Sequence, residues 1–525
     1  MNKEYYQTLK TILLPMKTFH RQRFTFNKGK IYPNDWLQTR PYTTTDSTDL
    51  YYVSLANRVM AAIKSSVVAD AFLDEHHIRL SALFLTEWFE DLCSGTHIWE
   101  TVNKECQKRY GVLLPFYDMD GYVKGEVNVQ DLKLLLWDII QTGRYDEGRI
   151  INPENPGIDE LARSLFEIFD QEYEYAPGND RLRDFILNPA IKKDLWAFRD
   201  WANWFTFRCY INHDAMNCLV EQLDEDKEHS EVLLYGAYAI HSLSHRKNLL
   251  SLSSPQWASR LLQDSLFEKE ALLPARPYLL QAIAAEGLHV QDLIEDKTLL
   301  IDAESLNQKD IDRKAYHEGQ SVLVCTLMSM NDRFYLCGAM HVIDRSDPKM
   351  DEFLEQQREQ HRLLSTQDQV YDDFLAANGG DDLFVAEDYQ GILRFYTETL
   401  GWKMGDNADI PEEVRHRSHY LLFADPKSGI QIVPNMARCV KLPGNPCYDP
   451  AFARKNASNP FFSNEAVSYR LSCRLRDRDL LPDAWMNSVK GEEYGRQFLH
   501  RNGDFFADYY FSCCREYDFE PFYRK

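Results

Sequence analysis

The sequence predicts a mainly α-helical protein, in which a body of many helices is followed by an α+β region with a small antiparallel sheet. Two observations lead to this fold class: a very apolar helical pattern at residues 128–141, and a change from period 3.6 to period 2 near residue 320. We place a basic N-terminal helix and extended arm at 1–45, a helical domain at 46–305 and an α+β domain at 319–525.

The central helical pattern begins at Asn128, a residue that favours the N-cap position, and runs to Gln141. Its apolar residues follow at helical spacing and form a stripe wider than half the circumference: Leu132, Leu135, Leu136, Ile139 and Ile140, with Val129, Leu134 and Trp137. Several other helices must pack against a helix of this kind. We therefore expect it near the middle of the helical core.

Other helices of the body are predicted from their ends and their spacing. Asp46 or Ser47 caps one helix, and Gly95 ends another at the position after its last turn. Further helical patterns cover residues 158–172, 191–210, 215–223 and 232–243, with weaker ones to about Ile294.

Two hairpins are predicted in the C-terminal part. One joins strands at 321–328 and 333–343, and the other joins strands at 419–423 and 430–433. Pro426 and Gly429 suit the turn of the second hairpin, because proline fits its first central position and glycine tolerates a positive φ. Residues 464–478 and 491–512 again have helical patterns.

The charge of the chain bears on its partners. The sequence has 59 Lys and Arg residues against 81 Asp and Glu residues, a formal net charge of −22. Such a surface repels nucleic acid phosphates unless a local basic face exists. Residues 1–40 are basic and either reach a nucleic acid or membrane surface or pack on the acidic surface of the protein itself. We favour packing, and we expect neither a nucleic acid nor a membrane as partner.

Cysteine usage and hydropathy favour a cytoplasmic location. None of the 11 cysteines forms a C-x-x-C pair, which favours free thiols in a reducing compartment. The sequence contains no run of about 18 apolar residues that would span a membrane. Its first residues also lack the pattern of a secretory signal peptide.

Several segments together resemble a known family. These are IYPNDWLQTRPY at 31–42, TDLYY at 48–52, WFED at 88–91, YGVLLPFY at 110–117, VQDL at 129–132 and LLW at 135–137. In combination they are similar to an uncharacterised protein family from gut Bacteroidetes, a domain of unknown function. The resemblance covers most of the chain and implies a bacterial protein, and it assigns no activity and no catalytic residue.

Two patterns are similar to metal sites. YDMDGYVKGE at 117–126 resembles a calcium loop, but Phe116 and Val127 stand where such a loop needs carboxylates. His241 and His245 lie at the spacing of two ligands on one helix face, with no obvious third ligand. We read the first as a surface turn and the histidines as ordinary, and we expect no metal and no cofactor.

The run FYTETLGW at 395–402 is similar to the end of a helix in a glyoxalase (vicinal-oxygen-chelate) module. The strands of the second hairpin offer no clear pair of metal ligands, which argues against an active version of that module. The alternative is an amphipathic helix with Ile392, Phe395, Tyr396 and Leu400 pointing inward.

A basic cluster in acidic surroundings is the candidate ligand site. It consists of Arg415, His416, Arg417 and His419. On a strand, Arg415, Arg417 and His419 would share one face and could hold a carboxylate or phosphate. The alternative is that the cluster neutralises nearby acids such as Glu412 and Glu413.

The sequence contains no catalytic constellation, so we expect a non-enzymatic interaction or regulatory protein with protein partners. The alternative is an enzyme or a small-anion-binding protein with a cleft between the helical and α+β parts.

Overall fold

The structure is a computed structural model that describes residues 29–142, 151–224, 231–264, 272–306, 316–402, 412–456, 467–481, 488 and 490–514. The chain divides into two compact units. The first contains Met1–Tyr145 and Pro153–Leu354, and the second contains Asp146–Asn152 and Glu355–Lys525. The division falls within one helix, α14 (Pro348–Ser365).

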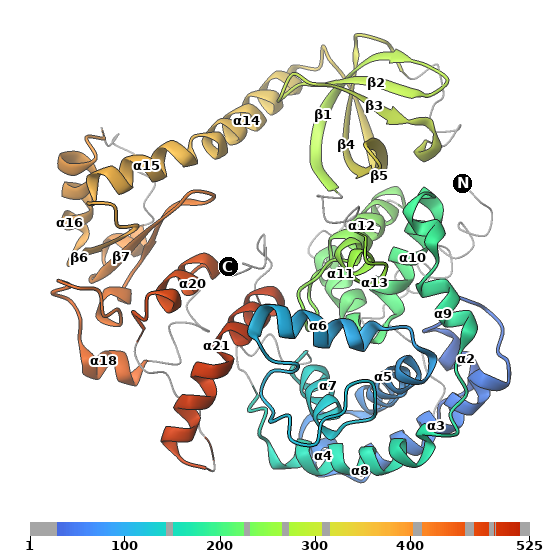
Figure 1. The fold of residues 1–525 in the computed structure, drawn as a ribbon. Coiled ribbons are helices and arrows are strands. Elements are labelled where there is room, and N and C mark those ends of the chain that lie inside the picture. Colours follow the sequence, from blue (N-terminus) through green and yellow to red (C-terminus); the bar gives the residue numbers. More distant parts are fainter. Residues whose placement is uncertain are drawn as a thin grey trace. The chain divides into compact units, whose positions relative to one another are not determined.

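The first unit begins with a body of helices (Figure 1). Its α-helices are α2 (Pro33–Leu37), α3 (Ser47–Lys64), α4 (Val67–Phe72), α5 (Glu75–Ser94), α6 (Ile98–Tyr110), α7 (Val129–Thr142), α8 (Pro156–Tyr173), α9 (Asp180–Ile186), α10 (Leu195–Arg208), α11 (Ala215–Asp224), α12 (Glu231–Ser244) and α13 (Ser254–Leu261). Short 3₁₀ helices η2 (Pro189–Lys192) and η3 (Tyr210–Asn212) flank α10. The prediction of a multi-helix N-terminal body is confirmed.

The predicted central helix is α7, which packs against α5 and α8. Leu132, Leu135 and Trp137 are fully buried, as their spacing predicts. Asp131 and Asp138, which the pattern places on the polar side, are buried as well. Asn128 precedes the helix, but its side-chain oxygen accepts the N–H of Val123 at 2.9 Å and so stabilises the preceding loop.

The first unit also contains a closed five-stranded β-barrel (Figure 1). Its strands are β1 (Leu272–Ile283), β2 (Gly287–Asp292), β3 (Thr298–Asp302), β4 (Ser321–Met330) and β5 (Arg333–Asp344). They follow the order β1-β2-β3-β5-β4, and β4 pairs with β1 to close the barrel. All neighbours are antiparallel except β3 and β5, which are parallel. The short 3₁₀ helix η5 (Ala303–Ser305) follows β3.

The barrel corrects two expectations. The weak helical pattern predicted to about Ile294 is wrong where β1 and β2 lie, and the predicted hairpin β4–β5 belongs to a barrel rather than to a small antiparallel sheet. In β1, Tyr278 and Leu280 face the barrel core, while Leu279 packs outward with Val322 and residues of α14. The stretch of β1 from Pro277 to Leu280 is apolar towards both faces, and periodicity cannot distinguish such a short run from a segment of a buried helix.

The barrel contacts the helical body through two glycines. Helix α12 packs on β5, and a β-bulge in β5 places Gly338 at φ +82° against Gly236 of α12. A Cβ on Gly236 would lie 2.8 Å from the backbone nitrogen of Ala339, and a Cβ on Gly338 would lie 3.0 Å from the Gly236 Cα. The bulge and the missing side chains therefore permit the close approach.

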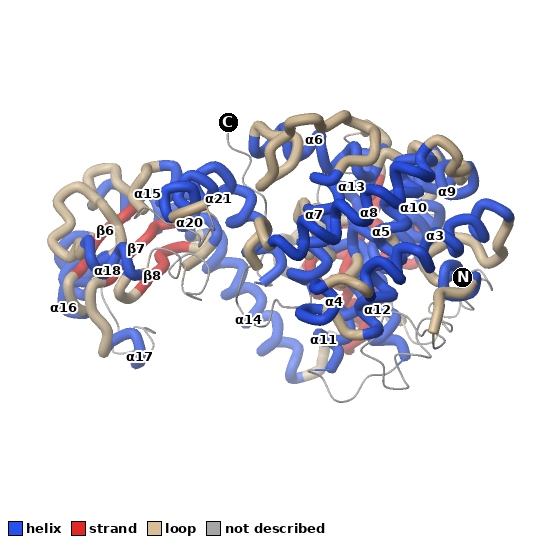
Figure 2. Tube along the Cα trace, turned by 90° about the horizontal axis from the view of Figure 1, so that it is seen from below, coloured by secondary structure: helices blue, strands red, loops and turns tan. Residues whose placement is uncertain are grey.

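The second unit holds a three-stranded antiparallel sheet in the order β6-β7-β8 (Figure 2). Its elements are α15 (Gln367–Ala377), β6 (Leu383–Ala386), α16 (Tyr389–Arg394), the π-helix η6 (Phe395–Thr399), α17 (Glu412–Arg415), β7 (Tyr420–Asp425), β8 (Gly429–Val433), η7 (Met436–Arg438), α18 (Pro450–Lys455), α20 (Tyr469–Asp477) and α21 (Glu492–Cys514). The second predicted hairpin is β7–β8, with Gly429 at φ +75°.

Helix α20 is bound to the ends of the sheet strands of the second unit by ion pairs. Arg474 contacts Asp382 at 2.7 Å, and Arg470 contacts Asp425 at 2.8 Å. Both carboxylates are buried, so their charges require these partners.

Among the described helices of the chain, none is long and apolar enough to cross a membrane.

We predict that Gly338→Ala lowers the free energy of unfolding by at least about 2 kcal/mol, because it adds a steric clash to the strain of a positive φ. Gly95→Ala is the matched control: Gly95 has φ +64°, and a Cβ added there would meet no heavy atom within 4 Å. It should cost about 1 kcal/mol. Urea unfolding followed by circular dichroism measures both, and equal losses would contradict the proposed contact between α12 and β5.

Candidate functional site

Residues 31–42, the first segment of the family resemblance, lie against the helical body. Pro33 occupies the first turn of α2, where no intrahelical N–H is needed. The backbone N–H of Ile31 donates to the side chain of Asn57 on α3 at 2.9 Å, and Trp204 of α10 donates to the carbonyl of Thr39 at 2.9 Å. The segment is therefore bound to two helices far apart in the sequence.

Asp49 of α3 accepts hydrogen bonds from several parts of the first unit. The indole of Trp36 donates at 3.1 Å, the hydroxyl of Tyr42 at 2.9 Å and the guanidinium of Arg181 at 2.5 Å. Asp49 also accepts the backbone N–H of Asp46 at 3.0 Å in a capping box at the start of α3. One fully buried carboxylate thus connects the N-terminal segment, α3 and α9.

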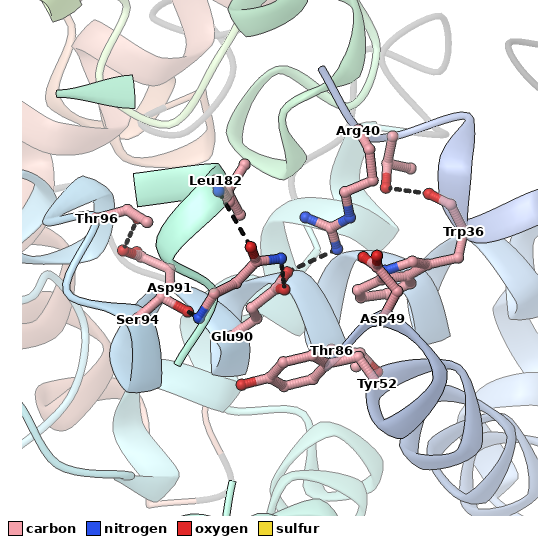
Figure 3. Close-up of polar contacts among 12 residues, drawn as sticks. Trp36, Arg40, Asp49, Tyr52, Thr86, Glu90, Asp91, Ser94, Thr96 and Leu182 are labelled. Atoms are coloured by element: carbon pink, nitrogen blue, oxygen red, sulfur yellow. Dashed lines mark hydrogen bonds and ion pairs between the residues drawn. The ribbon is translucent and has the colours of Figure 1, made fainter. Parts of the chain in front are cut away.

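The ion pair between Arg40 and Glu90 of α5 lies beside Asp49 (Figure 3). A guanidinium nitrogen of Arg40 lies 2.7 Å from a Glu90 carboxylate oxygen, and both side chains are at most 1% exposed. The guanidinium also stacks on the ring of Trp36, with 3.8 Å between its carbon and the ring centre. Burial alone would lower the pKa of Arg40, but Glu90 and Glu87 outweigh it and raise the pKa above its ordinary value.

Asn179, the N-cap of α9, completes this polar network. Its amide donates to Glu90 at 2.9 Å and to the hydroxyl of Tyr42 at 2.7 Å, and its oxygen accepts the backbone N–H of Leu182 at 3.1 Å. We call the side chains of Trp36, Arg40, Tyr42, Asp49, Glu90, Asn179 and Arg181 the N-terminal network. Because these polar groups bind one another and most are buried, the arrangement is suited to holding helices together rather than to turning over a substrate.

The next residue, Asp91, lies near the end of α5, and its side chain caps the N-terminus of α6. Its carboxylate accepts the backbone N–H groups of Ile98 and Trp99 at 3.2 and 2.7 Å. The hydroxyls of Thr96 and Tyr210 also donate to it. Asp91 therefore satisfies the free N–H groups at the start of α6, a structural role.

Asp131 of α7 is a second buried acid. The hydroxyl of Tyr122 donates to it at 3.1 Å and the amide of Asn128 at 3.3 Å. Burial raises its pKa to about 7, and hydrogen bonds from Trp99, Tyr122 and Asn128 only partly oppose that shift. The protonation of Asp131 therefore changes near neutral pH.

Both histidines of the pair donate a hydrogen bond to a backbone carbonyl. Nε2 of His241 donates to the carbonyl of Ala215 at 2.9 Å, and Nε2 of His245 donates to the carbonyl of Lys247 at 3.1 Å. Burial lowers the pKa of His241 to about 4 and that of His245 well below its usual value. Within the described residues, no group of three or more His, Cys, Asp or Glu side chains is arranged to hold a metal ion.

The segment at 117–126, which resembles a calcium loop in sequence, forms the turns that precede α7.

The candidate anion site is placed differently from the expected strand. Arg415 ends α17, His416, Arg417 and His419 follow in a turn, and β7 begins only at Tyr420. Because these residues precede the strand, Arg415, Arg417 and His419 do not share a strand face. Arg415, His416 and Arg417 are exposed.

The turn is stabilised by hydrogen bonds to backbone carbonyl groups. The hydroxyl of Tyr420 donates to the carbonyl of Arg417 at 2.6 Å, and the backbone N–H of His419 donates to the carbonyl of Glu387 at 2.8 Å. His419 has φ +57°, which departs from a strand and directs the chain into β7. The side chains of Glu412 and Glu413, the expected ionic partners, lie outside the described residues. Anion binding here stays a prediction, as does the alternative of an enzyme.

The run at 395–402 packs as the amphipathic alternative predicts. Ile392, Phe395 and Tyr396 lie in a core cluster with residues of β7, and Leu400 packs against it. Gly401 follows the helix at φ +70°. In the described residues, the adjacent sheet has three strands, and β6 pairs directly with β7.

The basic N-terminal residues are only partly described. Lys3, Lys10, Lys17, Arg21, Arg23 and Lys28 lie outside the described residues. Arg40, which belongs to the predicted basic arm, is buried in the N-terminal network, where it pairs with Glu90. Sequence reasoning missed this role because a lone arginine gives no sign of a carboxylate partner far along the chain.

We predict that Arg40→Met lowers the free energy of unfolding by about 3–5 kcal/mol, because it leaves the carboxyl group of Glu90 buried without its ionic partner. The double variant Arg40→Met/Glu90→Gln should recover part of that loss. Arg58→Met is the control, since Arg58 pairs with Glu172 between α3 and α8 but is 46% exposed. Its cost should be about 1 kcal/mol or less. Similar losses for Arg40→Met and Arg58→Met in urea unfolding would refute the buried pair.

We predict a pH dependence that belongs to Asp131. Its folded-state pKa of about 7 lies above the ordinary value of 3.8, so between these values the folded protein holds a proton that the unfolded chain releases. The free energy of unfolding therefore falls as pH rises through this window, by about 2–3 kcal/mol between pH 5 and pH 8 from this group.

Asp131→Asn should remove that contribution, so its stability relative to wild type should rise from pH 5 to pH 8. Asp120→Asn, at an exposed acid in the preceding turn, serves as the control and should leave the pH profile unchanged. Parallel pH profiles for wild type and Asp131→Asn would show that the buried carboxyl does not titrate in this range.

The comparisons with known proteins give one match. A family model described as "Protein of unknown function (DUF3843)" matches residues 30–275 and 334–512, and the unmatched stretch between them holds most of the barrel. No curated protein and no solved structure matches the chain. Because the model covers most of the sequence, including all the segments on which the resemblance rests, the chain belongs to the DUF3843 family.

Proposed function

We propose that this is a non-enzymatic interaction protein of the bacterial cytoplasm, in which the helical body supports the barrel and the outer face of β2 and β3 contacts the partner. The buried charges of the helical body favour this over catalysis, because Arg40, Asp49 and Glu90 are occupied by structural partners. The described cysteines are free thiols, as in a reducing compartment.

The topology of the barrel is the observation that carries the proposal. The order β1-β2-β3-β5-β4, closure by β1 and β4, and a parallel β3–β5 pair are the features of the OB-fold. OB-folds use the outer face of their second and third strands, with the loop between the first and second strands and the loop between the fourth and fifth, to bind extended ligands. Both loops lie at the same end of the barrel here, since Gly287 and Arg333 each contact Asp302.

Parts of the barrel surface are covered by the protein's own helices. The outward residues Tyr335 and Cys337 of β5 are buried on the side of α12, and Val322 of β4 is buried against α14. By contrast, Gln281 of β1 and Thr298 of β3 are exposed. The face that an OB-fold uses for binding thus carries exposed side chains, as does the end of β5 at His341 and Val342.

Site-specific photo-crosslinking in the native host tests the proposal. A photoreactive amino acid at Gln281 or Thr298 should give discrete adducts on irradiation, because both side chains are exposed on the barrel. The matched control is Gln107, an exposed glutamine of α6. Adducts at the two barrel positions and none at Gln107 are expected. The absence of any adduct at the barrel, or an identical pattern at Gln107, would contradict the proposal.

A further inference from the structure

Strand β8 forms an open edge of the sheet in the second unit (Figure 2). The backbone N–H of Ala424 in β7 donates to the carbonyl of Asp382, just before β6, at 2.9 Å. Because bonding directions alternate along a strand, the residues of β8 opposite Ala424 and Leu422 direct their backbone groups away from β7. These residues are Ile430 and Ile432. Within the described part of the chain, no hydrogen bond to their N–H or carbonyl groups is present.

The opposite edge of the sheet is partly closed by the chain itself. The outward N–H of Leu383 in β6 donates to the carboxylate of Asp381 at 3.0 Å, and its carbonyl accepts the amide of Asn378 at 2.8 Å. Two exposed acids, Glu387 and Asp388, follow β6. Proteins commonly protect sheet edges with such contacts, charges, prolines or bulges. Strand β8 has the sequence GIQIV, with no charge, proline or bulge, so an extended segment can add to it as a further strand.

The side chains of β8 indicate which residues of an added strand would be apolar. Ile430 and Ile432 are partly buried and pack on the core cluster that contains Phe374 of α15. Gln431 points to the other face, where its amide donates to Ser428 at 3.0 Å. In an added strand, every second residue would lie beside the two isoleucines. This arrangement favours apolar side chains at alternate positions of that strand.

Exposed cations lie at both ends of β8. Lys427 is exposed in the turn before the strand, and Arg417 is exposed in the segment beside its far end. That segment is positioned by Ser418, whose carbonyl accepts the backbone N–H of Asn435, two residues after β8, at 3.0 Å. A strand of five residues spans about 17 Å, so the two ends of a short added strand would lie near the two cations. Acidic flanking residues would complement them.

A second copy of the chain fits this edge less well. Each copy has a formal net charge of −22, so two copies repel each other. Strand β8 contains no acid that could face the cations of another copy.

We propose that β8 binds an extended segment of a partner protein as an added antiparallel strand, in which apolar residues alternate and acidic residues flank them. The backbone groups of Ile430 and Ile432 form ladder hydrogen bonds with that segment, and its flanking carboxylates lie near Lys427 and Arg417. This surface belongs to the second unit and is separate from the outer face of β2 and β3. Its failure would therefore leave the proposed function in place.

Fluorescence anisotropy on the full chain tests the proposal with three labelled peptides. The first is EEVTVTVEE, which has the proposed pattern. The second, KKVTVTVKK, reverses the flanking charges. The third is the acidic peptide with N-methylated valines, because residues that bond to the edge have side chains on the face of Ile430 and Ile432. The acidic peptide should bind, and the other two should bind at least about tenfold more weakly.

Variants of the chain separate the backbone from the charges. Ile432→Pro removes an outward N–H without removing a bond to β7, so the sheet should tolerate it while binding falls about tenfold. Ile432→Ala is the matched control, since it also loses the side chain but keeps the N–H, and it should bind within about threefold of wild type. Arg417→Glu should weaken binding of the acidic peptide and strengthen that of the lysine-flanked peptide. Arg394→Glu, at an exposed arginine of α16, should change neither.

Circular dichroism confirms that each variant is folded. The proposal would be overturned if the acidic peptide does not bind, if its N-methylated form or the lysine-flanked peptide binds equally well, or if folded Ile432→Pro binds like wild type. Light scattering tests the competing occupant. A wild-type dimer that Ile432→Pro converts to a monomer would assign β8 to a second copy of the chain and would also overturn the proposal.

Discussion

The buried ion pair between Arg40 and Glu90 is the interaction on which the arrangement of the helical body depends. Removing two charges from water costs several kcal/mol per ion, and only close geometry and further hydrogen bonds offset this cost. Here the offset comes from the Trp36 ring and from the amide of Asn179, which belong to different parts of the chain. The pair is therefore stable only when the N-terminal segment, α5 and α9 are all in place.

The same ion pair explains how residues 31–42, which contain little regular secondary structure, become part of the core. Residues 31–42 contain one short helix, which would not form alone in water. The segment gains its order from tertiary contacts: Trp36 with Asp49, Arg40 with Glu90, and Thr39 with Trp204. Three segments of the family resemblance, at 31–42, 48–52 and 88–91, meet in this network.

Local signals were sufficient for several elements. The stripe of α7, the Asp46 cap of α3, the positive φ of Gly95 and the hairpin β7–β8 all depend on residues within a few positions of one another. The barrel could not be predicted in the same way. Its closure joins β1 to β4 and β3 to β5, and its strands are buried on both faces where α12 and α14 cover them. The roles of Arg40 and Glu90, and the exposure of Gln281 and Thr298 on the barrel, likewise depend on the folded structure.

Hydrogen–deuterium exchange measured by mass spectrometry tests most directly whether the N-terminal segment belongs to the core. If the ion pair joins residues 31–42 to α5, backbone amides in both regions should exchange together and only on the slow timescale of global unfolding. Arg40→Met should accelerate exchange in both. Exchange of residues 31–42 within seconds, while α5 stays protected, would show an independent arm and would contradict the account.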